Sequence, residues 1–116
     1  MDIYNIWCDL KTGVPDLEFV AAVRAYLDRL HAEGKLAGYR ITRRKLGLGP
    51  ADIPEWHLSL DFTGLAQLDA AFGAASERAD PIEALHHAVN GKVDRVRFAL
   101  YRDFPDAHRR AGEERF

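Results

Sequence analysis

Hydrophobic and polar residues alternate along three stretches of the chain, a pattern that predicts β-strands with two unlike faces. These stretches are residues 3–10, 56–62 and 92–101. A fourth stretch, residues 36–46, is rich in residues that favour strands, and it is predicted to be the second strand in chain order. The apolar faces carry Tyr4, Ile6 and Cys8, then Trp56, Leu58, Leu60 and Phe62, then Val96, Phe98 and Leu100.

Apolar residues recur at steps of three and four in three other segments, which predicts amphipathic helices. The first helix is predicted to end at Gly34, which can adopt the left-handed conformation that follows many helices. Thr63 is predicted to cap the second helix. Asp80 as N-cap, Pro81 at the first helical position and Glu83 predict a short third helix that ends at residue 90. The stripes of the first two helices are Phe19 or Val20, Val23, Leu27 and Leu30, and then Leu65, Leu68, Ala71, Phe72 and Ala75.

The resulting order is βαββαβ with an extra short helix before the last strand. The first two helices must cover the apolar faces of the strands, because those side chains would otherwise lie in water. We therefore expect an α+β, ferredoxin-like sandwich over residues 1–103, followed by a loosely packed tail over residues 104–116. Glycines and prolines between positions 47 and 54 predict an exposed hairpin loop between the second and third strands.

The face of the sheet that points away from the helices carries large and charged side chains. Trp, Tyr and Arg are enriched where protein surfaces associate, so a second copy of the sheet is expected to cover this face. The alternative is a solvated surface with cross-strand ion pairs. The candidate dimer residues are Asn5, Trp7, His57, Asp61, Arg97 and Tyr101.

Composition narrows the class of protein. The 116 residues include 16 basic and 18 acidic side chains, and a formal charge of −2 argues against a nucleic-acid binder. No apolar run approaches the roughly 20 residues of a membrane span. The single cysteine, Cys8, excludes an internal disulfide and fits a reducing compartment, so a cytoplasmic protein is expected. Adjacent His86 and His87 point about 100° apart on a helix and do not make a metal site.

The element order, the length and the aromatic second face together resemble the dimeric α/β-barrel superfamily of small ferredoxin-like proteins. The resemblance covers residues 3–101. The stretches Ile3–Leu10, Arg43–Pro50 and Gly112–Phe116 are also similar to an uncharacterised bacterial family of unknown function.

Some members of that superfamily are monooxygenases, and the resemblance implies a pocket between sheet and helices. Their pocket holds an Asn on the first strand, a Trp at the end of the third and a His on a later helix. Here His86 matches, Phe62 stands where the Trp would be, and Asn5 falls on the opposite face of its strand.

We therefore expect a homodimer with a small apolar cleft in each subunit, lined by Tyr4, Trp56 or Phe62, and His86. The expected function is binding of a small organic molecule, with no cofactor and no metal. Two alternatives stay open at this point. One is a cofactor-independent or haem-linked monooxygenase or an isomerase acting in the cleft, and the other is a structural dimer without a ligand.

Overall fold

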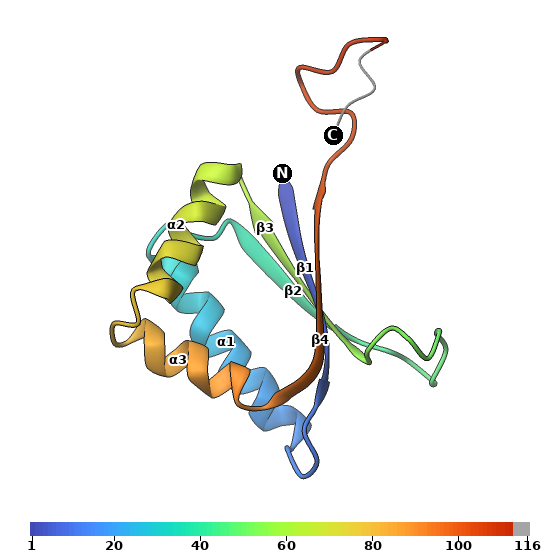
Figure 1. Cartoon of the computed structure of the whole chain (residues 1–116), viewed down its shortest axis with the longest axis vertical. Helices are drawn as coiled ribbons and strands as arrows, with labels where there is room; N and C mark the ends of the chain where they lie inside the picture. Colours follow the sequence, from blue (N-terminus) through green and yellow to red (C-terminus); the bar gives the residue numbers. More distant parts are fainter. Residues whose placement is uncertain (113–116) are drawn as a thin grey trace.

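The chain has an α+β fold of the ferredoxin-like type, in which three helices cover one face of a four-stranded antiparallel sheet (Figure 1). A computed structural model describes residues 1–112. Its elements are β1 (Asp2–Leu10), α1 (Asp16–Ala32), β2 (Gly38–Arg43), β3 (Trp56–Phe62), α2 (Leu65–Ser76), α3 (Ile82–Asn90) and β4 (Val93–Arg102).

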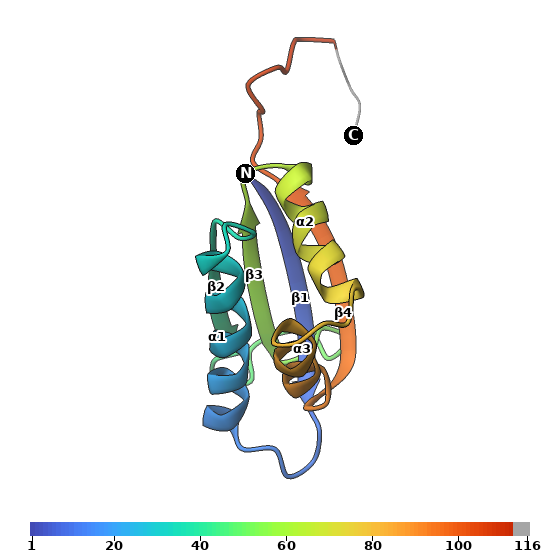
Figure 2. The same ribbon diagram turned by 90° about the vertical axis from the view of Figure 1, so that its left-hand side faces the viewer.

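The strands lie in the order β2-β3-β1-β4, so the first and third strands occupy the centre of the sheet as expected. Their register pairs Tyr4 with Leu60 and Trp7 with His57. Because alternate side chains point to opposite faces, this register places the predicted apolar faces of the two strands on the helical side, namely Tyr4, Ile6 and Cys8 of β1 and Trp56, Leu58, Leu60 and Phe62 of β3. Figure 2 shows the three helices in front of the sheet.

The core lies between the sheet and α1, where the apolar stripe of the helix is buried as predicted. Gly34 has a φ of 73°, the left-handed conformation predicted for it after α1. The fully or almost fully buried apolar residues are Cys8, Phe19, Val23, Leu27, Leu30, Leu36, Trp56, Leu58, Leu60, Phe62, Ala71, Ala74 and Ile82.

The predicted starts of the second and third helices were wrong in detail. Gly64, not Thr63, occupies the N-cap position of α2, and Gln67 instead reaches back to accept a hydrogen bond from the Thr63 N–H at 2.8 Å. Pro81, not Asp80, occupies the N-cap position of α3, and no side-chain cap bond forms there. Both helices therefore rely on packing more than on capping.

The second strand is shorter than predicted, running over Gly38–Arg43. Leu36, at the predicted start, is instead buried in the core at 2% exposure. The chain after Arg43 forms the predicted loop, with one further backbone bond from the Arg44 N–H to the Glu55 carbonyl at 2.8 Å.

The fourth strand corrects the expectation that the helices cover every apolar strand face. Phe98 and Leu100 lie on the helical side of β4 but are 59% and 52% exposed. The strand is at the edge of the sheet, where it has a neighbouring strand on one side only. Within the described residues, the tail after β4 continues beyond the sheet, and its Phe104 is 67% exposed (Figure 1). Phe116 lies outside the described residues.

Candidate functional site

A cavity of about 250 Å³ lies between the helical layer and the sheet. Its walls come from β1, β3 and β4 on one side and from all three helices on the other. The lining is mostly aliphatic and aromatic, and the lining residues include no Asp, Glu, Lys or Arg. It consists of Tyr4, Ile6, Cys8, Val23, Tyr26, Leu27, Leu30, Leu58, Leu60, Phe62, Ala71, Phe72, Ala75, His86, Val89, Asn90, Val93, Val96 and Phe98.

Three aromatic rings meet at one wall of the cavity. The Tyr4 ring stacks on Phe98 with centroids 5.7 Å apart, and it meets Phe72 edge-on at 5.2 Å. Both geometries are favourable for aromatic pairs. Phe72 and Phe98 are partly open to solvent, so this wall also forms the mouth of the cavity.

A few polar groups interrupt the apolar lining. The His86 ring lies 5.5 Å from the Tyr26 ring, measured between centroids. Burial raises the pKa of Tyr4 and that of Tyr26, so both phenols are protonated at neutral pH. Burial, together with the Asp9 carboxylate, raises the pKa of the Cys8 thiol to about 11, which makes the thiol a small neutral group and a poor nucleophile.

The structure brings three of the four predicted cleft residues together. Tyr4, Phe62 and His86 all line the cavity, but Trp56 does not. Trp56 and Phe62 are six positions apart along an extended strand, which corresponds to a distance of about 20 Å. The Trp56 ring is instead buried against Phe19. The Arg43 guanidinium lies over this ring, with its carbon Cζ 5.0 Å from the ring centroid. Of the two alternatives given for this position, Phe62 lines the cavity and Trp56 lies outside it.

A hydrogen-bonded pair on the opposite face of the sheet, which we call the open face, was not foreseen from the sequence. The Asn5 amide nitrogen donates to the carbonyls of Ile3 at 3.2 Å and Ala99 at 3.5 Å. Its oxygen therefore faces His57 Nε2, 2.8 Å away, and accepts a hydrogen bond from the N–H at that position. In neutral His57 this leaves Nδ1 without a proton, 3.5 Å from the Thr42 hydroxyl.

The surroundings of His57 favour this neutral form. Burial lowers the pKa of the imidazole, and the ring stacks on Trp7 with centroids 4.9 Å apart. Asn5 is 8% exposed, which is unusual for a polar side chain on a sheet face that no helix covers. Alternation had placed these residues on one face, but only the register of β1 and β3 shows that they meet.

All six candidate dimer residues lie on the open face. Ile3 pairs with Asp61 and Tyr101, and Trp7 pairs with His57 and Arg97, so these side chains share a face with Asn5. The Tyr101 side chain is 61% exposed.

Residues 1–112 contain no group of three or more His, Cys, Asp or Glu side chains placed to hold a metal ion. In the same part of the chain, none of the helices is long and apolar enough to cross a membrane.

Three solved structures illustrate the range of proteins that share this fold. The Arabidopsis thaliana protein At3g17210 aligns with a TM-score of 0.69 and 10% identity, over 89% of this chain and 95% of its own. Hydroxynitrile lyase from Passiflora edulis aligns with a TM-score of 0.64 and 11% identity, over 86% and 90%. A dimeric ferredoxin-like protein of unknown function from Jannaschia sp. CCS1 aligns with a TM-score of 0.64 and 14% identity, over 89% and 100%.

At such low identities these similarities show the fold alone. No curated protein matches the chain. The family comparison is more direct, because it matches the whole length of the sequence, residues 1–116. The chain belongs to DUF6614, a family of unknown function.

Proposed function

We propose that the protein binds a small neutral organic molecule in the cavity between sheet and helices. The observation that carries this proposal is the composition of the lining, which is apolar with a few polar groups and contains no Asp, Glu, Lys or Arg. Ligand sites commonly have this composition. A charged ligand would lose its hydration without gaining a counter-ion, which is costly. The volume of about 250 Å³ is below the usual range of roughly 300–1,000 Å³ and favours a compact ligand of one or two rings.

The proposed active form is a homodimer that packs through the open face. A sheet either has both faces covered by protein or leaves one face in contact with water. The open face carries Trp7, Arg97 and Tyr101, which are residue types typical of interfaces. The molecule is only 18 Å across its shortest dimension, as expected for one sheet and one helical layer. Ferredoxin-like proteins from Jannaschia and Thermobifida fusca are described as dimeric, which supports the same arrangement here.

The experiment that tests the cavity uses 2-naphthol as a neutral probe and 2-naphthoate as its charged counterpart. Calorimetric titration should show saturable binding of 2-naphthol and at least tenfold weaker binding of 2-naphthoate. Ala75→Phe should abolish binding, because Ala75 lines the cavity and the added ring would fill it. Ala70→Phe is the matched control on the same helix, since Ala70 is exposed and does not line the cavity. Equal binding by both variants, or no binding by the unaltered protein, would contradict the proposal.

A second candidate function is catalysis in the same cavity, by an isomerase or a cofactor-independent monooxygenase. His86 favours it, because it is the one imidazole among the lining residues and it adjoins the Tyr26 ring. An imidazole can move a proton near neutral pH. The Passiflora hydroxynitrile lyase shows that this fold can hold an enzyme. If the protein is an enzyme, His86→Gln should retain ligand binding and lose turnover. Binding without turnover in the unaltered protein would exclude catalysis and leave ligand binding as the only proposed function.

A further inference from the structure

A groove on the helical side of the molecule borders the cavity, and we call it the α2–α3 groove. It lies between α2 and α3, which are consecutive helices on the same side of the sheet (Figure 2). Its lining includes the charged side chains of Asp69, Arg78 and Glu83, none of which lines the cavity. The groove is therefore polar where the cavity is apolar.

Four residues line both the cavity and the groove, namely Phe72 and Ala75 of α2 and His86 and Asn90 of α3. Each pair is spaced by three or four positions, so its two side chains lie on one face of their helix. The cavity and the groove therefore meet between the two helices, and these four side chains form the boundary. Ala75 carries only a methyl group, which leaves the boundary thin at this position.

A glycine within α2 keeps the groove open. Gly73 lines the groove but not the cavity, and a Cβ added there would meet nothing within 4 Å outside its own stretch of helix. Glycine is a poor helix former, and close packing against another element does not require it here. A larger residue at this position would instead extend into the groove.

The polar residues of the groove have unused hydrogen-bonding capacity. Among residues 1–112, the side chains of Asp69, Arg78 and Glu83 make no hydrogen bond or ion pair with another residue. In the same part of the chain, the Asn90 side chain at the boundary has no such partner either. Because the groove holds two carboxylates and one guanidinium, it offers acceptors and donors together and suits an uncharged chain with hydroxyl and ether oxygens.

We propose that the natural ligand has two parts: a compact apolar ring system held in the cavity, and an uncharged hydroxylated chain that extends between α2 and α3 into the groove. The cavity of about 250 Å³ has room for the rings alone, and its apolar walls give hydroxyl groups few partners. In the groove, the chain exchanges water for protein donors and acceptors, so its polar groups stay paired. This inference rests on the proposed ligand binding and adds the class of ligand.

The first test blocks the groove and leaves the cavity intact. The probes are 2-naphthol, which has two rings and one hydroxyl, and the naphthyl ether of diethylene glycol, which adds an uncharged hydroxylated chain. Gly73→Phe should weaken calorimetric binding of the glycol ether at least tenfold and that of 2-naphthol less than twofold, because the new ring occupies the groove. Ala66→Phe is the matched control, since Ala66 is exposed on the same helix and lines neither hollow.

The outcomes separate this inference from the proposed function. The two-part ligand is wrong if the unaltered protein binds 2-naphthol but not the glycol ether, and the cavity proposal then stands. It is also wrong if Gly73→Phe weakens the binding of both probes equally or of neither. If the unaltered protein binds neither probe, both proposals fail. Circular dichroism should show that both variants remain folded.

A second test concerns the chemistry of the chain. In the naphthyl hexyl ether, a chain of the same length carries methylene and methyl groups in place of the second ether oxygen and the hydroxyl. Asn90→Leu removes a hydrogen-bonding group at the boundary, so it should weaken binding of the glycol ether at least fivefold and should not weaken binding of the hexyl ether. Equal losses for the two ethers would overturn recognition of a hydroxylated chain.

Discussion

The two faces of one sheet differ in how complete they are within a single chain. On the helical face, Leu58, Leu60 and Phe62 of β3 are buried at 6% exposure or less. On the open face, the side chains that alternate with them are polar and only partly buried. Yet the open face is organised, because Asn5 and His57 fix each other's orientation there. Burial by helices is thus one way to order a sheet face, and a hydrogen-bonded pair of side chains within the face is another.

A change of oligomeric state is expected from charging the open face at its centre. Trp7→Glu should weaken dimerisation by at least about 2 kcal/mol, or roughly thirtyfold, because interface tryptophans often carry this much binding energy. Light scattering after size exclusion should then report the mass of a monomer.

Leu17→Glu is the control for that variant, since Leu17 is 80% exposed at the start of α1 in the helical layer. Tyr101→Glu offers a milder change on the open face, at an exposed edge position. If Trp7→Glu and Tyr101→Glu both keep the dimer mass, the open face is not the interface.

The helical face should respond in stability. Phe62→Ala should lower the free energy of unfolding by about 3–5 kcal/mol, as expected for removing a buried phenylalanine from a core. Phe62 is 1% exposed and also lines the cavity, so some loss of ligand binding should accompany the change. Urea denaturation measures the effect, and Leu17→Ala should shift the midpoint little. Equal shifts in the two variants would show that this face is less tightly packed than its burial indicates.

The smallest effect concerns the pH dependence of stability. Because burial lowers the pKa of folded His57, its contribution to stability is fully present above the unfolded pKa of about 6.5. It is lost as the pH falls through the folded pKa, since the folded state binds the proton less readily. His57→Gln keeps a donor for Asn5 and should flatten this part of the profile. Parallel profiles of unfolding free energy between pH 5 and 7.5 for the two proteins would contradict the assignment.

Much of the fold could be predicted from the sequence, because alternation in β1 and β3 and the stripe of α1 report directly which side is buried. The exposure of Phe98 and Leu100 could not, since a pattern shows which face is apolar but not how far a helix extends over it. The same limit explains Trp56, whose face was right but whose place along the strand lies beyond the cavity.

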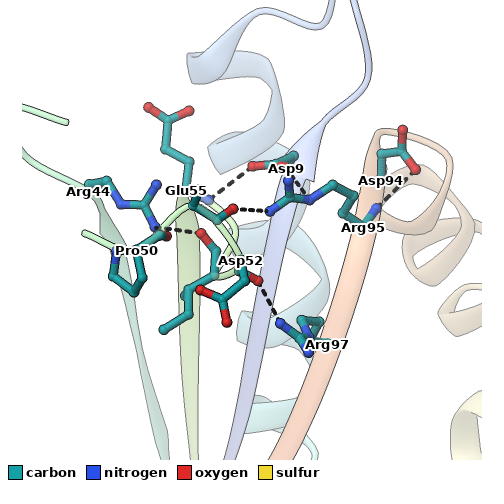
Figure 3. Close-up of polar contacts among 10 residues, drawn as sticks. Asp9, Arg44, Pro50, Asp52, Glu55, Asp94, Arg95 and Arg97 are labelled. Carbon is teal, nitrogen blue, oxygen red and sulfur yellow. Dashed lines mark hydrogen bonds and ion pairs between the residues drawn. The ribbon is translucent and has the colours of Figure 1, made fainter. Parts of the chain in front are cut away.

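The Asn5–His57 pair marks another boundary of sequence reasoning. The two residues come from adjacent central strands and lie diagonally, because Asn5 pairs with Ser59 and His57 with Trp7. Alternation along each strand places both residues on one face. It does not fix the offset between the two strands, and that offset decides whether the two side chains meet. Alternation likewise places Arg97 on the open face, but only the fold brings Arg95 and Arg97 to the backbone of the loop between β2 and β3 (Figure 3).

The incomplete cover over β4 bears on how the chain stays dispersed in solution. A ten-residue edge strand with Phe98 and Leu100 uncovered offers a row of unpaired amide groups beside greasy side chains. Such edges nucleate aggregation through cross-strand addition. The solubility of the chain therefore depends on whatever shields this one strand from other molecules.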